Sequence, residues 1–206
     1  MKIHDISMTV HSDMQVYKSR QEMRPELKIT RDFDDSAARE TTLCMNLHTG
    51  THMDMPLHFI PGGATIDQFD ISRLVTACHV IDLTGVDLAI HAEDLMPFDI
   101  REGETILFKT RNSLSEDFDF EFVYLATDGA EFLAAKGINC VGTDSLGIER
   151  AQSDHGTHKT LLGAGIIIIE GLRLKDVPQG RYELCAVPIK IAGAEAAPVR
   201  AFLIER

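Results

Sequence analysis

One eleven-residue stretch, from His48 to His58, concentrates side chains that bind metal ions. It reads His-Thr-Gly-Thr-His-Met-Asp-Met-Pro-Leu-His, and it holds three of the nine histidines of the 206-residue chain together with an aspartate. Histidine and aspartate are common ligands of transition metals. Because an outward strand face usually carries Lys, Glu and Thr instead, we interpret the stretch as a metal site rather than as a surface strand.

The spacing predicts how the backbone positions these groups. Successive side chains of a strand point to opposite faces, so His48, His52 and Asp54 share one face. A helix is disfavoured by Gly50, Pro56 and the β-branched threonines. We therefore expect a strand that runs from about Thr42 and opens into a loop near Pro56, with Gly50 leaving room for an ion between the flanking imidazoles.

A second group of candidate ligands lies far along the chain. Glu170 ends the apolar run of residues 166–169, at the carboxyl end of a strand, where open α/β sheets place their ligands. His158 precedes this run on a predicted helix. Taken by itself, Glu170 is better explained as a solvated residue at a strand boundary, so this second group depends on the first.

The composition sets limits on the class of protein. Nucleic-acid binding needs a basic face, and the net charge of −12 argues against one, so we expect no nucleic-acid partner. The N-terminus has no apolar signal core and no run is long enough to span a bilayer, which predicts a cytoplasmic protein without a membrane partner. The length predicts a single domain over residues 1–206. The four cysteines never form Cys-x-x-Cys, so we treat them as small core residues.

The remaining pattern predicts a mixed α/β or α+β protein with a β-rich first half. Alternating apolar residues predict strands, a polar segment at residues 10–29 predicts a long loop, and Asp128 with Glu131 predicts a capped helix start that Gly137 closes. The expected strands are 3–8, 42–55, 79–83, 105–109, 122–126, 140–143, 166–169, 182–191 and 199–204. The expected helices are 92–96, 130–136 and 154–162.

Two motifs resemble those of the cyclase or kynurenine-formamidase-like family of metal-dependent hydrolases. The first is His48-Thr-Gly-Thr-His52-Met-Asp54-Met-Pro-Leu-His58, which matches the family pattern H-x-G-[TA]-H-x-D-x-P-x-H. The second runs from His158 to Glu170 and matches H-x11-E. The order and length of the elements also fit, so the resemblance covers essentially the whole chain.

The resemblance implies a swivelling β/β/α fold with a central mixed or barrel-like sheet flanked by helices. It implies a homodimer or higher homo-oligomer with up to two divalent ions per chain, zinc or alternatively manganese. His48, His52 and Asp54 would hold one ion and His158 the other. Asp54 and Glu170 would reach both, as two-oxygen carboxylates can, and His58 would donate and accept protons.

One departure from the family concerns the substrate. Members that act on N-formylkynurenine carry Pro-Val-Trp-Pro in the first loop, whereas this chain has Tyr17 there and no tryptophan anywhere. We therefore expect hydrolysis of a carbon–nitrogen bond in a small amide, formamide or cyclic amide, with Tyr17 as a substrate-binding residue. Lactone hydrolysis, a cyclisation or dehydration on the same site, and a non-catalytic metal-binding protein are the alternatives.

Overall fold

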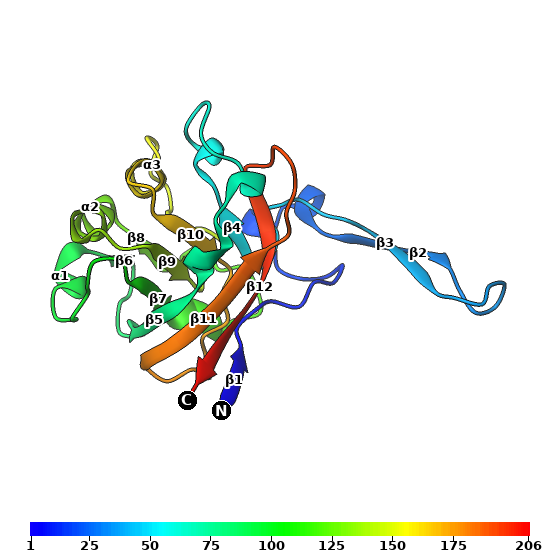
Figure 1. Ribbon diagram of the computed structural model, residues 1–206, viewed down its shortest axis with the longest axis horizontal. Helices are drawn as coiled ribbons and strands as arrows, with labels where there is room; N and C mark the ends of the chain where they lie inside the picture. Colours follow the sequence, from blue (N-terminus) through cyan, green and yellow to red (C-terminus); the bar gives the residue numbers. More distant parts are fainter.

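A closed mixed sheet forms the centre of the molecule, described by a computed structural model that covers all residues from Met1 to Arg206. The strand order is β1-β12-β11-β5-β7-β9-β10-β4, and β12 also pairs with β4, so the sheet closes on itself (Figure 1). β4 and β1 pair with successive parts of the same edge of β12. The strands are β1 (Lys2–Asp5), β4 (His52–Asp54), β5 (Val75–Asp82), β7 (Thr105–Lys109), β9 (Cys140–Thr143), β10 (Ile167–Glu170), β11 (Gly180–Pro188) and β12 (Ala196–Glu205).

Apolar side chains cover both faces of this sheet. On β10, Ile167 and Ile169 belong to one buried cluster, and Ile168 points into another that includes Leu133 and Leu161 from the helices. Each such side chain contributes roughly 1.5–3 kcal/mol when it leaves water. β10 is therefore buried on both faces. The predicted mixed α+β class with a barrel-like sheet flanked by helices is confirmed.

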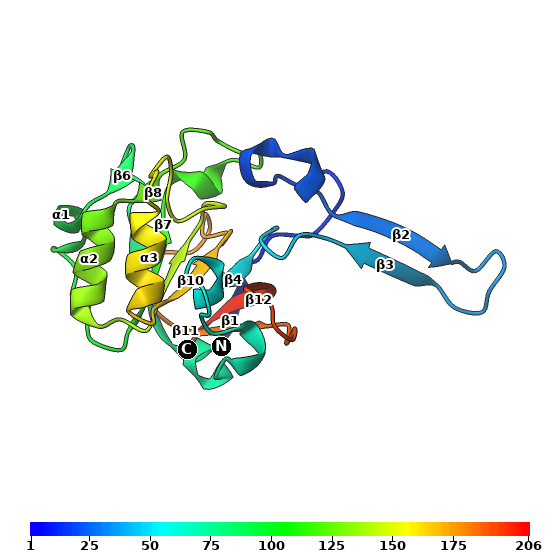
Figure 2. The ribbon, with the colours of Figure 1, turned by 90° about the horizontal axis from the view of Figure 1, so that it is seen from above.

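Three helices lie on one side of the sheet, and α2 and α3 run side by side (Figure 2). α2 ends at Gly137, whose φ of 65° is the left-handed conformation that glycine accepts most readily. The predicted capping role of Asp128 is wrong, because its carboxylate accepts hydrogen bonds from the backbone N–H of Ala92 and from the ring of His91. Asp128 thus links α2 to α1. The helices are α1 (Ala92–Leu95), α2 (Thr127–Lys136) and α3 (Gly156–Gly163).

The single strand predicted from Thr42 to Pro56 is wrong. β3 (Glu40–Cys44) ends early, β4 spans only His52–Asp54, and Gly50 between them has φ 73°, which interrupts an extended strand. A Cβ on Gly50 would meet Met14 Cε at 3.2 Å, so Gly50 serves a turn and does not open space between imidazoles.

A two-stranded arm projects from the body. β2 (Glu26–Arg31) and β3 pair only with each other, and every residue of both strands is exposed (Figures 1 and 2). The predicted loop over residues 10–29 is therefore wrong at its end, where β2 begins. Leu27 and Leu43 are directly paired, so both lie on the same face of the arm. This arm carries an apolar face without a partner within the chain.

Smaller features complete the fold. β6 (Ala89–Ile90) and β8 (Tyr124–Leu125) form a short parallel pair beside the helices. All four cysteines are free. Cys78 and Cys140 are buried as expected, but Cys44 is exposed on the arm and Cys185 is only partly covered. None of the helices has the length and apolar character that crossing a bilayer requires.

Candidate metal centre

The pairing of β4 with β10 brings three ligand-type side chains to one face of the sheet. His52 lies opposite Glu170 and Asp54 lies opposite Ile168 in an antiparallel register. Directly opposed residues point to the same face, so His52, Asp54 and Glu170 all face the layer of helices. The alternation predicted for His52 and Asp54 holds within β4, where Met53 points into the opposite core.

His158 reaches this group from the helix above it. It lies in the first turn of α3, and its Nε2 is 3.7 Å from Asp54 Oδ2 and 3.5 Å from Glu170 Oε1. Glu170 is fixed in turn, because its Oε1 accepts a 2.6 Å hydrogen bond from the backbone N–H of Ile148. The two distant sequence segments therefore meet at one place.

Two further histidines come from irregular segments on either side of β4. His48 lies in the turn before it, and its Nδ1 is 3.0 Å from Asp54 Oδ1. His58 ends the 3₁₀ turn Pro56–His58, with its ring centroid 4.1 Å from that of His48 and 5.8 Å from that of His158. Burial lowers the pKa of His58. His58 is thus beside the group, while no carboxylate lies within ion-pair distance of its ring.

Unpartnered buried atoms indicate what the group binds. Both carboxylate oxygens of Asp54 and Nε2 of His52 are buried, and their contacts with neighbouring ligands lack hydrogen-bond geometry. Burying such groups without a partner is costly. Tetrahedral ligands at about 2.1 Å from a zinc ion lie about 3.4 Å from each other, close to the 3.0–3.7 Å separations around Asp54. The donor set therefore fits a divalent cation.

The electrostatics of the centre favour positive charge. Burial lowers the pKa of His52, but Glu170 and Asp54 outweigh it and raise this pKa to about 9. Burial acts in the same direction on His158, yet the nearby carboxylates of Asp54, Glu149 and Glu170 raise its pKa to about 11. Burial raises the pKa of Glu170, as does Asp54, and the two histidines lower it to about 2. In the metal-free protein, protons on the histidines supply the positive charge that these carboxylates stabilise.

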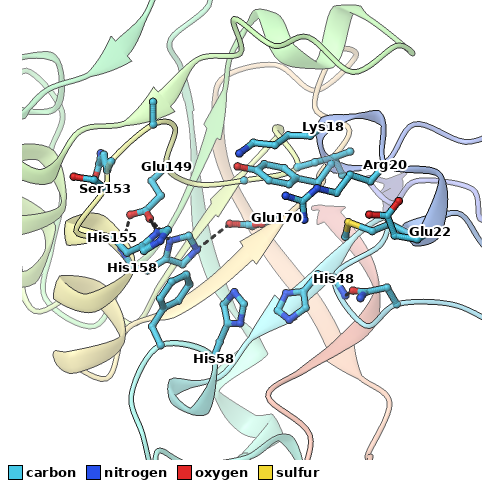
Figure 3. Close-up of a pocket in the computed structure, with 18 residues that line it drawn as sticks. Lys18, Arg20, Glu22, His48, His58, Glu149, Ser153, His155, His158 and Glu170 are labelled. Atoms are coloured by element: carbon cyan, nitrogen blue, oxygen red, sulfur yellow. Dashed lines mark hydrogen bonds and ion pairs between the residues drawn. The ribbon is translucent and has the colours of Figure 1, made fainter.

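A cavity of about 630 Å³ opens over the centre. His48, His58 and His158 lie on one side of it, and the first loop with Lys18, Arg20 and Glu22 lies across from them (Figure 3). The residues that line it are Tyr17, Lys18, Arg20, Glu22, Met23, Asn46, His48, His58, Phe59, Leu146, Gly147, Glu149, Ala151, Gln152, Ser153, His155, His158 and Glu170. The cavity is large enough for a small molecule.

Tyr17 lies in the wall of this cavity, as its predicted role requires. Its ring packs edge-on against Phe118 at 5.6 Å and Phe122 at 6.5 Å, which fixes its position. Burial raises the pKa of Tyr17, so its hydroxyl stays protonated. The next two residues, Lys18 and Ser19, have positive φ values of 54° and 52°, and such backbone strain is concentrated at functional sites.

The sequence did not identify four neighbours of the centre. Glu149 and Glu195 contact His158 and His48. His155 contacts Glu149, and the ring of Phe59 stacks on His158 with centroids 4.3 Å apart. His155 and His158 form a His-x-x-His spacing on the sequence, which could have marked His155. The two glutamates carry no comparable signal, because only the folded chain brings them to the histidines.

The closed sheet and the His/Asp/Glu centre define a metal-dependent hydrolase that uses a divalent ion. Residues 4–150 match the model of the Cyclase family, described as "Putative cyclase". The chain belongs to this family.

Similar proteins cover the whole length of the chain. A kynurenine formamidase of Salinibacter ruber is 36% identical over 98% of this chain and 97% of its own. A solved structure described as a predicted metal-dependent hydrolase from Bacillus stearothermophilus is 47% identical, covers 100% of this chain and 98% of its own, and superposes with a TM-score of 0.92. Isatin hydrolase A from Labrenzia aggregata, 24% identical over 98% of this chain and 93% of its own with a TM-score of 0.86, shares the fold.

Proposed function

We propose that this protein hydrolyses the carbon–nitrogen bond of a small amide, formamide or cyclic amide. The observation that carries the proposal is the unpartnered, fully buried Asp54 carboxylate, which faces three histidines beneath the cavity. In this assignment His48, His52 and Asp54 hold one ion and His158 holds the other, with Asp54 and Glu170 reaching both. The kynurenine formamidases among its relatives support this class of reaction.

The positions of the residues around the cavity suggest a separate role for each in the reaction. A bound divalent ion would acidify a water molecule and polarise the carbonyl group of the substrate. His58 borders the cavity without a carboxylate partner, so its ring is free to take a proton from the attacking water and to deliver it to the departing nitrogen. Phe59 stacks on His158 and lines the cavity beside the centre.

Metal dependence tests the proposal most directly. We expect up to two ions per chain, bound by nitrogen and oxygen ligands only, with zinc the preferred ion and manganese the alternative. Elemental analysis, chelator treatment and re-addition of each metal would measure this. The substrates to compare are formylated aromatic amines, cyclic imides and lactones. Absence of any bound metal without activation by zinc or manganese, or a preference for lactones, would contradict the proposal.

The cavity supports a substrate with negative charge. Lys18 and Arg20 line it, and neither forms an ion pair with a carboxylate of the chain. Arg24, also in the first loop, lies 3.8 Å from Asp13 and does not line the cavity. We propose a small amide that carries a carboxylate, bound between these two cations and the ring of Tyr17.

We predict that N-formylkynurenine is hydrolysed weakly or not at all, because Tyr17 offers a smaller aromatic face than tryptophan. Steady-state kinetics measure this. A kcat/KM at or above about 10⁴ M⁻¹s⁻¹, as expected of a true substrate, would show that Tyr17 replaces tryptophan and that the chain is a kynurenine formamidase like its relatives.

Substituting Lys18→Met should raise KM for the anionic substrate by about tenfold or more, the effect of losing one charge-assisted hydrogen bond.

We further propose that the protein is a cytoplasmic homodimer or higher homo-oligomer that uses its arm for assembly. An isolated two-stranded ribbon is only marginally stable in water, and the Leu27–Leu43 pair on the arm is roughly half exposed. A second copy of the chain that packs on this face would remove both leucines from water.

The arm predicts a mutational effect on assembly. Replacing Leu27 and Leu43 by glutamate should convert the oligomer to monomers, because four charges would enter each two-fold contact. Size-exclusion chromatography with light scattering measures the mass. The double substitution Lys28→Glu with Thr42→Glu, on the opposite face of the same ribbon, is the matched control and should keep the oligomer. A leucine variant that stays oligomeric would exclude the arm from the interface.

A further inference from the structure

Each of the three histidines assigned as metal ligands places its second ring nitrogen near a group outside the ligand set. His52 Nδ1 is 2.9 Å from the backbone carbonyl oxygen of Gly50. His48 Nε2 is 3.3 Å from Glu195 Oε1, and His158 Nδ1 is 3.2 Å from Glu149 Oε1. Such outer contacts fix the tautomer and the orientation of a metal-binding imidazole.

Glu149 is the most constrained of these outer groups. It is buried, at 5% exposure, on the loop that connects β9 to α3. Its Oε1 contacts both His158 Nδ1 and, at 2.5 Å, His155 Nδ1, while its Oε2 accepts a 3.1 Å hydrogen bond from the backbone N–H of His158. It therefore hydrogen-bonds to the backbone of His158 and places a carboxylate oxygen beside the ring, at ion-pair distance from Nδ1.

We propose that Glu149 and Glu195 are positioning residues, each dedicated to a different ion. Glu149 acts through His158 and directs Nε2 of that ring toward Asp54 and Glu170. Glu195, from the loop between β11 and β12, acts through His48 and directs Nδ1 toward Asp54. This inference rests on the proposed two-ion centre. It adds that two carboxylates outside the ligand set, Glu149 and Glu195, each orient the histidine of a different ion.

A purely structural role of Glu149 makes a different prediction. Its contact with the backbone N–H of His158 places a negative charge in the first turn of α3, where such a charge stabilises a helix. If this were its whole function, Glu149→Gln would lower the melting temperature of the metal-free protein and would leave the affinity of the folded protein for metal unchanged.

A double-mutant cycle on metal affinity separates these roles. Zinc is titrated into the metal-free full-length protein against a chromophoric chelator, and melting of the metal-free form confirms folding. We expect Glu149→Gln to lower the affinity for one of the two zinc ions by about 10- to 100-fold, the usual effect of losing an outer contact. In a His158→Ala background, which retains the ion of His48, Glu149→Gln should change nothing further. In the same His158→Ala background, Glu195→Gln should lower the affinity for the remaining ion by a similar factor.

Each outcome of the cycle has a distinct meaning. Unchanged affinity for both ions in Glu149→Gln, or a further loss in the His158→Ala background, would overturn the inference. A wild-type protein that binds no zinc in this titration would instead overturn the proposed function. If Glu149→Gln does not fold, Glu149→Asp keeps the charge on a side chain one methylene shorter, and the same cycle applies to it. Glu93→Gln, at an exposed position of α1, controls for the loss of one negative charge and should bind both ions as the wild type does.

Discussion

Replacing His58 with alanine should reduce turnover by roughly 10² to 10⁴ while the protein keeps its metal. His58 borders the cavity, and no carboxylate of the centre lies within ion-pair distance of its ring. The nitrogen atoms within 4 Å of the Asp54 carboxylate belong to His48, His52 and His158, at 3.0, 3.5 and 3.7 Å, whereas the nearest His58 nitrogen is beyond that distance but within 4.8 Å. Removing the imidazole of His58 therefore takes away a proton carrier and leaves the three closest nitrogen contacts of Asp54 in place.

The measurement pairs kinetics with metal content on the same preparation. Steady-state kcat and elemental analysis of His58→Ala are compared with those of His11→Ala, an exposed histidine that does not line this cavity. The His11 variant should retain most of its turnover. A His58→Ala protein that loses its metal would show that His58 is a ligand, and equal losses in both variants would show that neither has a specific role in proton transfer.

The local pattern of the sequence predicted the part of the site that β-strands build. His52 and Asp54 alternate with Met53 on β4, and the isoleucine run before Glu170 forms β10 with both faces buried. In these segments the period of two decides which side chains share a face, and that period can be counted on the sequence. The strands and helices of the second half were likewise predicted from local patterns, the strands from their apolar residues and the helices from their capping and terminating residues.

The sequence failed where the backbone leaves regular structure. His48 was placed on a strand, but the positive φ of Gly50 puts it in a turn, from which it still reaches Asp54. The start of β2 was taken for the end of a loop and part of β3 was joined to the strand predicted from Thr42, because the arm packs on nothing in the chain and has no strong apolar pattern. Glu149 and Glu195 were missed because their partners are brought close only by the tertiary fold, 9 and 147 residues away along the chain.

The role of Asp54 predicts a larger effect than that of any other single residue. Its carboxylate is almost fully buried, lies within 4 Å of nitrogen atoms of three histidines, and is expected, together with Glu170, to reach both ions. Asparagine has nearly the same shape, but it replaces one acceptor oxygen with an amide N–H₂ group and removes the negative charge. Two divalent ions would then share only the Glu170 carboxylate.

We therefore expect Asp54→Asn to lose both ions and to lose activity by more than the roughly 10⁴-fold limit for His58→Ala, because the metal chemistry and the proton transfer fail together. Burial raises the pKa of Asp54, but His158 and His48 hold it well below its usual range, so the carboxylate is charged at neutral pH and its removal matters there. Elemental analysis, zinc titration and thermal melting of the metal-free protein measure the effect. Melting should show a folded protein, since Asn fills the same space. A folded Asp54→Asn variant that still binds two ions with wild-type affinity would remove Asp54 from the ligand set and, with it, the bridging role on which the two-ion assignment depends.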